Sequence, residues 1–124
     1  MAQIEIKTVR ELDLTFIIIV GKVTVAELID TLKMFYDSYV TTNILWDFSN
    51  CDVSDLAKGD LSTVVNVARR YAALRPNGKS AFVASNELAM GIGSIYSSLS
   101  VMKSHTISNA VFSSREEAFE WLDS

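Results

Sequence analysis

The stretch NILWDFSNCDVSDLAKGD, from Asn43 to Asp60, decides the fold. Its first half is an apolar run that ends in Trp46 and Asp47, and its second half is a polar, acidic segment that opens a helix. A short apolar run bounded by polar residues is typical of a buried strand. We therefore expect the central strand of a sheet, followed by a loop at its carboxyl end, where ligands and partners bind in open α/β sheets.

Two strands are expected before this stretch. Gln3 to Val9 alternates between apolar and polar side chains, which is typical of a half-buried edge strand. The short polar segment from Arg10 to Asp13 suits a hairpin connection. Leu14 to Val20, LTFIIIV, is continuously apolar and rich in β-branched residues, which predicts a strand covered on both faces. Gly21 is expected to end that strand.

Two helices flank the central strand. The first is expected to begin after Thr24, because Glu27 stands three residues later and completes a capping box. The apolar positions of this helix fall on one face: Val25, Leu28, Ile29, Leu32, Phe35, Tyr36 and Tyr39. The second helix is expected from residues 59–60 to the Pro-Asn-Gly at residues 76–78. Its expected buried stripe is Leu61, Val64, Val65, Ala68 and Ala72.

The remaining elements continue the alternation of strands and helices. Ser80 to Ala84 is expected to be a short strand, and residues 85–86 cap a third helix that ends near Lys103. A last strand is expected within His105 to Phe112, followed by a final helix with acids in its first turn. The order β-β-α-β-α-β-α-β-α predicts an α/β fold: a mostly parallel central sheet with an antiparallel N-terminal edge and helices packed on it. We expect residues 1–124 to form a single domain.

Composition and charge narrow the range of functions. Of the 124 residues, 49% are hydrophobic, which is enough to build a core without disulfides or a structural metal. The net charge of −4 argues against nonspecific nucleic-acid binding, since that needs Lys and Arg to neutralise phosphates. Cys51 is the only cysteine, so no disulfide forms within the chain. With no signal-peptide pattern and no apolar run long enough to span a bilayer, a cytoplasmic protein is expected.

The element order and three segments resemble the STAS domain, the fold of the bacterial anti-sigma-factor antagonists. Residues 44–49, ILWDFS, look like the family's apolar strand that ends in Asp-Leu-Ser, and residues 79–84, KSAFVA, look like its next strand. Residues 114–122, SREEAFEWL, look like the closing helix of the SpoIIAA-like branch. The resemblance spans nearly the whole chain and implies a STAS/SpoIIAA-like fold.

One segment departs from the family pattern. In the antagonists an Asp-Ser-Ser-Gly motif follows this strand, and a partner kinase phosphorylates its serine. When Asp47 is placed on the family's strand-end aspartate, residues 55–58, Asp-Leu-Ala-Lys, fall on that motif, so neither serine is kept. Ser54 lies nearby but outside this register, and whether it is phosphorylated stays open. The resemblance to the SpoIIAA-like branch implies a small carrier of nonpolar ligands or a membrane-associated module.

Four carboxylates lie in the stretch that decides the fold: Asp47, Asp52, Asp55 and Asp60. Converging carboxylates can bind a metal ion or act as general acid and base. Their spacing fits no calcium loop, so we expect Asp47 to cap backbone amides, Asp52 and Asp55 to form Asx turns, and Asp60 to start a helix. We expect no enzyme, metal or cofactor. An enzyme would need Asp47, Asp55 and His105 within hydrogen-bond reach of one another.

Two further residues with reactive side chains stand alone in the sequence. Cys51 has no partner cysteine and no nearby cation, so we expect a small packing residue in a loop rather than a reactive thiol. His105, the only histidine, has no neighbouring nucleophile or ligand pattern. We expect it to be a surface residue where a strand starts.

The third helix carries the strongest indication of a ligand site. Two interior glycines, Gly91 and Gly93, each cost about 1 kcal/mol relative to alanine, so this helix is expected to need close packing or mobility. Its expected apolar face is Leu88, Ile92, Ile95, Tyr96, Leu99 and Met102. One interpretation is simple packing on the sheet, and the other is a movable lid over an apolar cleft. The residues expected to bind a ligand are Trp46, Phe48, Met90, Ile95, Tyr96 and Met102.

The expected function is a non-enzymatic binding module that carries a small nonpolar ligand, with peripheral membrane contact left open. The alternative is a regulatory protein-docking domain of the anti-sigma-factor-antagonist type without the usual phosphoserine switch. The residues expected to bind a partner are Asp47, Asp52, Ser54, Asp55 and Leu56. A homodimer is also left open, since Val67 and Trp121 are placed at the edges of their helices' buried stripes and exposed apolar groups often mark interfaces.

Overall fold

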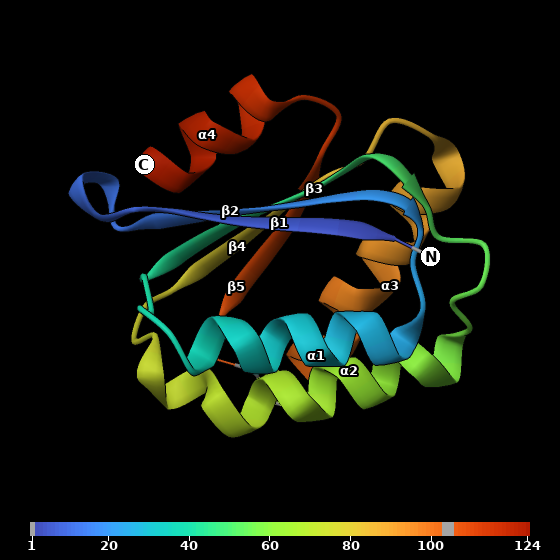
Figure 1. Ribbon diagram of the computed structural model, residues 1–124, viewed down its shortest axis with the longest axis horizontal. Helices are drawn as coiled ribbons and strands as arrows, with labels where there is room; N and C mark the ends of the chain where they lie inside the picture. Colours follow the sequence, from blue (N-terminus) through green and yellow to red (C-terminus); the bar gives the residue numbers. More distant parts are fainter. Residues whose placement is uncertain (1, 103–105) are drawn as a thin grey trace.

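The computed structural model describes residues 2–102 and 106–124, and within these ranges five strands form one sheet in sequential order (Figure 1). The strands are β1 (Gln3–Val9), β2 (Leu14–Lys22), β3 (Asn43–Asp52), β4 (Lys79–Val83) and β5 (Ser108–Phe112). The helices are α1 (Val25–Tyr36), α2 (Lys58–Tyr71), α3 (Glu87–Met102) and α4 (Arg115–Asp123). Short 3-10 turns, η1 (Arg10–Leu12) and η2 (Ala72–Leu74), follow β1 and α2.

The pairing of the strands explains the layers of the molecule. β1 pairs with β2 in antiparallel fashion, and the pairs β2–β3, β3–β4 and β4–β5 are parallel. Crossovers of the same hand that step in one direction place their helices on the same face of a sheet. Accordingly α1, α2 and α3 cover one face, and α4, which follows β5, covers the other (Figure 1). The α/β fold predicted from the element order is confirmed.

The sheet separates two apolar cores. The larger core lies under α1, α2 and α3 and includes Ile17, Ile44 and Trp46. The smaller core lies under α4 and includes Leu45, which is also fully buried. Side chains alternate between the faces of a strand, so β3 sends Ile44 and Trp46 to one core and Leu45 to the other. Burial on both faces explains the continuous apolar run in the sequence.

Local signals in the sequence predicted several elements correctly. The Thr24 hydroxyl accepts from the Glu27 amide at 3.2 Å, and the Glu27 carboxylate accepts from the Thr24 amide at 3.0 Å, so the capping box of α1 is confirmed. Asn86 caps α3 by accepting from the Ala89 amide at 2.9 Å. The stripe predicted for the second helix is buried throughout: Leu61, Val64, Val65, Ala68 and Ala72.

Two strands run further than the sequence predicted. Gly21 does not end β2, which continues to Lys22, and β3 continues past Phe48 to Asp52. Residues 20–22 pair with residues 50–52 after a shift in register. Gly21 has a φ of 95°, which glycine adopts without steric strain, and the strand continues through it. The polar segment is therefore strand as far as Asp52, and the loop before α2 is only residues 53–57.

Four further residues are compared with the expectation, and one of them, Trp121, agrees with it. Val67 is buried in the larger core, so it exposes no apolar surface. Tyr39 lies beyond the end of α1 and is largely exposed, with the Arg10 guanidinium 4.2 Å from its ring centroid. Trp121 is half-buried against Phe112, as expected for the edge of a buried stripe. His105, and with it the predicted start of the last strand, lies outside the described residues.

Candidate functional site

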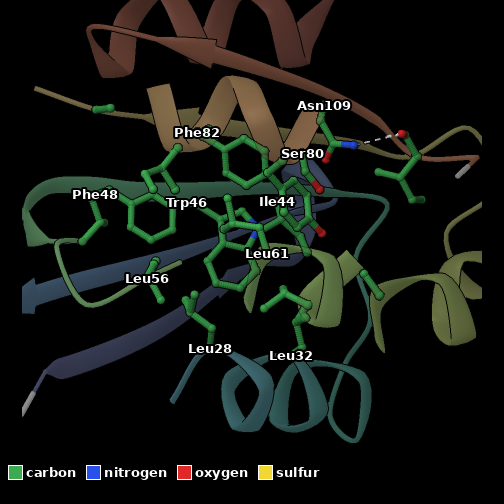
Figure 2. A pocket seen from close by; sticks show the side chains of 18 of the residues that line it. Leu28, Leu32, Ile44, Trp46, Phe48, Leu56, Leu61, Ser80, Phe82 and Asn109 are labelled. Carbon is green, nitrogen blue, oxygen red and sulfur yellow. Dashed lines mark hydrogen bonds between the residues drawn. The ribbon is translucent and has the colours of Figure 1, made fainter. Parts of the chain in front are cut away.

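A cavity of about 70 Å³ lies between the sheet and the helices α1, α2 and α3 (Figure 2). The sheet supplies Ile44, Trp46, Phe48, Ser80, Phe82 and Asn109 to its lining, and Ala84 follows directly after β4. The helices and the loop before α2 supply mainly aliphatic side chains, among them Leu28, Leu32, Val53, Leu56, Leu61, Val64 and Ile92. A single water needs about 10–15 Å³ measured in this way. The cavity can therefore hold a small molecule, and a longer ligand requires one wall to move.

The floor of the cavity follows from strand alternation and register. Ile44, Trp46 and Phe48 are alternate residues of β3 and share the helix-covered face. Ile44 pairs with Ser80 and Trp46 pairs with Phe82 in the neighbouring strand. The rings of Trp46 and Phe48 are nearly parallel, with centroids 6.1 Å apart. Aromatic side chains thus occupy the half of the floor nearer the carboxyl ends of the strands.

The residues expected to bind a ligand divide into two groups. Trp46, Phe48 and Tyr96 line the cavity, whereas Met90, Ile95 and Met102 do not. Met90 is 37% exposed, Ile95 38% and Met102 78%, so the expectation that these three would line an apolar cleft is wrong. The sequence did predict the presence of an apolar cleft beside Trp46 and Tyr96 correctly.

Close packing between α3 and β5 explains why Met90, Ile95 and Met102 face away from the cavity. A Cβ atom on Gly93 would lie 2.8 Å from Cγ2 of Val111, so only glycine allows this approach. The inward face of α3 therefore consists of Ala89, Ile92, Gly93, Tyr96 and Ser100. Gly91, in contrast, has nothing within 4 Å of an added Cβ atom.

Arg75 forms a buried polar end to this apolar cavity. The residue is 3% exposed. Its Nε donates to the Thr42 carbonyl at 2.9 Å and its Nη2 to the Lys79 carbonyl at 2.8 Å. Its Nη1 donates to the Ser80 hydroxyl at 3.1 Å and to the Tyr36 hydroxyl at 3.5 Å. Figure 2 shows Ser80 and Asn109 at one end of the cavity and Phe48 and Leu56 at the other.

The sequence reasoning missed this polar end. Ser80 and Asn109 carried a usable signal, because each stands two residues before an inward-facing apolar residue, Phe82 and Val111. A polar side chain in such an alternation indicates a polar contact within the core. Arg75 carried no signal, since an arginine near the end of a helix resembles an ordinary surface residue.

Asp47 lies on the opposite face of the sheet, under α4. Its carboxylate accepts from the Ser49 amide at 2.9 Å and also from the Ser49 hydroxyl. The Arg115 guanidinium pairs with it at 2.6 Å. Burial disfavours the charged carboxylate, but the bonds from Ser49 and the pairing with Arg115 outweigh burial and hold the pKa of Asp47 below its usual value. The predicted capping of a backbone amide is confirmed, and the ion pair was not anticipated.

The other three acids do not converge on Asp47. Asp52 accepts from the Ser54 amide at 2.9 Å, which confirms the predicted Asx turn. Asp60 accepts from the Ala57 amide at 2.9 Å in the first turn of α2, as predicted. Asp55 instead pairs with Lys22 at 3.5 Å, and both side chains are half-exposed. Among residues 2–102 and 106–124, no cluster of His, Cys, Asp and Glu is placed to bind a metal ion.

Cys51 lies in β3 rather than in a loop, and it is buried in the larger core. Burial, reinforced by the neighbouring charge of Asp52, raises the pKa of its thiol to about 11. The thiolate is the reactive form of cysteine, so a thiol this weakly acidic is a poor nucleophile at neutral pH. Packing is the role that the structure supports for Cys51.

The residues expected to bind a partner are split between three environments. Asp52, Ser54 and Asp55 are exposed on and beside the loop of residues 53–57. Leu56 is only 8% exposed and lines the cavity. Asp47 is only 4% exposed, beneath Arg115 on the other face. The exposed acids form a small surface next to the cavity, while Leu56 belongs to the cavity wall.

Solved structures share this arrangement of strands and helices over nearly the whole chain. An uncharacterised protein from Shewanella loihica with a SpoIIAA-like fold has a TM-score of 0.58 at 15% identity, over 98% of this chain and 93% of that one. An anti-sigma factor antagonist from Mycobacterium paratuberculosis has a TM-score of 0.62 at 11% identity, over 100% and 96%. The chain has a SpoIIAA-like fold. No family model and no curated protein match its sequence.

The SpoIIAA-like fold confirms the resemblance drawn from the strand and helix motifs. At these identities the likeness concerns the fold alone, so the roles of individual side chains rest on the geometry of this SpoIIAA-like chain. No helix among its described residues is long and apolar enough to span a bilayer.

Proposed function

We propose that this protein is a binding module for a small nonpolar ligand. The observation that carries the proposal is the cavity on the helix-covered face, lined by Trp46, Phe48, Phe82 and Tyr96 and by aliphatic side chains. Protein interiors are close-packed, and voids larger than a water molecule are few. A void with an aromatic lining is a typical site for a small ligand.

The third helix supports a ligand larger than the present void. Only Ala89 and Ser100 of α3 are fully buried, and the helix carries two glycines. Ile92 and Tyr96 face the cavity, whereas Leu88, Ile95 and Met102 are exposed, so only part of the apolar surface of α3 resists an outward shift. Each additional CH₂ group that a ligand buries contributes about 0.8 kcal/mol against the cost of such a shift.

A cavity-filling substitution tests the proposal, with 1-octanol as the probe. Ala89→Leu places a larger side chain on the inward face of α3, whereas Ala73→Leu makes the same change at an exposed position. We expect amide chemical shifts around the cavity to move on titration of the wild-type protein and of Ala73→Leu, and not of Ala89→Leu. A wild-type spectrum that does not respond to the probe contradicts the proposal.

A regulatory protein-docking domain is the second candidate function. It is favoured by the likeness to an anti-sigma factor antagonist and by the exposed acids Asp52 and Asp55 beside Ser54. Leu56 and Ala57 stand where the phosphorylated motif has serines, so docking here would not use a phosphoserine at those positions. A basic surface on the partner protein would complement the two acids.

Charge reversal tests the docking function. We expect a protein captured from host extract by the wild-type chain to be lost with the double variant Asp52→Lys and Asp55→Lys. Asp30→Lys reverses an exposed acid on α1 and is expected to retain the captured protein. Equal capture by all three chains contradicts docking at this surface.

Membrane contact and homodimerisation are proposals for the outward face of α3. Leu88, Val101 and Met102 are more than half exposed there, and after Glu87 the helix carries no charged residue. Sedimentation with lipid vesicles tests membrane contact, and native mass spectrometry tests self-association.

A further inference from the structure

The guanidinium of Arg75 is a buried cation that pairs with no carboxylate among the residues that the structure describes. All four of its hydrogen-bond acceptors are neutral: two carbonyls and two hydroxyls. The ion pairs of the described residues join other groups, Lys22 with Asp55 and Arg115 with Asp47. Burying a charge is costly unless an opposite charge lies nearby. Arg75 also lines the cavity, so an anion in the cavity would reach it.

Polar and apolar residues occupy opposite ends of the cavity floor. In the first row across the sheet, Ile44 pairs with Ser80, and Ser80 pairs with Asn109. In the next inward-facing row, Trp46 pairs with Phe82, and Phe82 pairs with Val111. Phe48 stands one row further, about 13 Å from the first row at ~3.3 Å per residue. The floor therefore changes from polar to apolar along the strand direction.

We propose that the cavity binds a monocarboxylate with an apolar tail of moderate length, its carboxylate at Arg75 and its tail beside Trp46 and Phe48. This inference rests on the proposed ligand-binding function and specifies the class of ligand. A single negative charge balances the single buried cation. A carboxylate accepts charge-assisted hydrogen bonds from a guanidinium, which are stronger than those between neutral groups.

Three groups can donate to the carboxylate. A guanidinium has five N–H donors, and Arg75 uses four of them within the protein, so one Nη2 hydrogen is available. The hydroxyls of Tyr36 and Ser80 accept from Arg75, which leaves their own hydrogens free to point into the cavity. In the part of the chain that the structure describes, neither hydroxyl donates to another group.

Tyr96 lines the cavity beside Phe82, in the apolar row of the floor. Its ring meets Phe82 edge-on, with centroids 5.4 Å apart. Burial raises the pKa of the Tyr96 hydroxyl, so this group stays uncharged and adds no negative charge that would compete for Arg75. Among the described residues that line it, the cavity thus presents one cation and no anion to an incoming ligand.

A series of eight-carbon probes tests the inference on the wild-type protein. Octanoate, 1-octanol and octylammonium have unbranched chains of similar length, and their head groups are anionic, neutral and cationic. By titration calorimetry we expect octanoate to bind about tenfold or more tightly than 1-octanol, and octylammonium to bind most weakly. If 1-octanol binds as tightly as octanoate, the inference is overturned while the nonpolar-ligand function stands. If no probe binds, both are overturned.

Substitutions locate the carboxylate. Ser80→Ala and Tyr36→Phe each remove one hydroxyl, and we expect each to weaken octanoate binding several-fold while 1-octanol binding stays unchanged. Arg75→Met removes the charge and is expected to abolish the preference for octanoate. Arg69→Met makes the same change at an exposed position and is expected to bind like wild type. If Arg75→Met does not fold, the two milder variants decide. If Ser80→Ala and Tyr36→Phe both keep the wild-type preference for octanoate, the carboxylate binds elsewhere and the inference is overturned.

Discussion

At the scale of single residues, two arginines are held in opposite ways. Arg115 is half-exposed and meets a carboxylate, that of Asp47. Arg75 is buried, donates to carbonyl and hydroxyl oxygens, and lies 5.9 Å from the centroid of the Phe35 ring. The first arrangement satisfies both charges within the chain. The second leaves a positive charge that neutral dipoles stabilise incompletely. The ion pair and the proposed binding site thus lie on opposite faces of the sheet.

The ion pair on the α4 face gives a pH-dependent prediction. Because the pKa of Asp47 is lower in the folded chain than its ordinary value of 3.8, its stabilising effect is present above that value and is lost as pH falls through the folded-state pKa. We expect Asp47→Asn to lower the free energy of unfolding by about 2 kcal/mol at neutral pH and by much less near pH ~3. Urea unfolding at both pH values measures the difference.

Asp55→Asn is the matched control for this prediction. Its pair with Lys22 is half-exposed on both sides, and exposed pairs contribute little. We expect its free energy of unfolding to stay within about 0.5 kcal/mol of the wild-type value at both pH values. A loss for Asp47→Asn that is equally large in acid would show that the carboxylate charge is not responsible.

At the scale of elements, α3 differs from α1 and α2 in how it contacts the sheet. α1 and α2 bury large aliphatic and aromatic side chains, such as Leu28, Phe35 and Leu61. α3 buries Ala89 and Ser100 and brings Gly93 against Val111. Close backbone approach at Gly93 adds to the side-chain packing of Ile92 and Tyr96 in this helix. Its attachment to the sheet therefore combines a few side chains with one glycine contact.

The two glycines of α3 should respond in opposite directions to alanine. At Gly91 an added Cβ meets nothing within 4 Å, so Gly91→Ala is expected to raise the free energy of unfolding by about 0.5–1 kcal/mol. At Gly93 it would lie 2.8 Å from a methyl of Val111, whose β-branched side chain has little rotamer freedom. We expect Gly93→Ala to be at least about 1 kcal/mol less stable than Gly91→Ala. Thermal and urea unfolding compare the two, and equal stabilities would contradict this packing of α3.

Elements with local signals were predictable from the sequence, and those set by distant contacts were not. The start of α1 follows from Thr24 and Glu27, which lie three residues apart. The extension of β3 to Asp52 depends on pairing with residues 20–22, which are far away in the chain. Gly93 packs against Val111, and apolar periodicity predicted the inward face of α3 only in part. Ile92 and Tyr96 do face the cavity. Leu88, Ile95 and Met102, also predicted for that face, are exposed.

At the scale of the whole molecule, the sequential strand order places three helices and the cavity on one face. α4 and the Asp47–Arg115 pair occupy the other face. The fold could be predicted because strand and helix patterns alternate clearly along the chain. The site could be predicted only in part: Trp46, Phe48 and Tyr96 follow from aromatic patterning, whereas the position of Arg75 depends on acceptors from α1 and from the starts of β3 and β4.

The unequal burial of the helices predicts that α3 is the most mobile wall of the cavity. α2 buries five side chains and α3 only two, so α3 should open locally at a lower free energy. We expect amides of residues 87–102 to exchange with deuterium faster than those of residues 58–71. Saturating octanoate is expected to slow exchange in α3 selectively. Equal protection of both helices, with and without octanoate, would contradict a movable wall.

The two tryptophans lie on opposite faces of the sheet, and this gives the molecule two separate optical reporters. Trp46 stacks on Phe48 in the cavity, and Trp121 packs against Phe112 on the α4 face. Trp121→Phe would leave an indole whose emission senses only the cavity. Trp46→Phe would leave one whose emission senses only the α4 face. Filling of the cavity and loosening of the α4 face could then be followed separately by fluorescence, one in each variant.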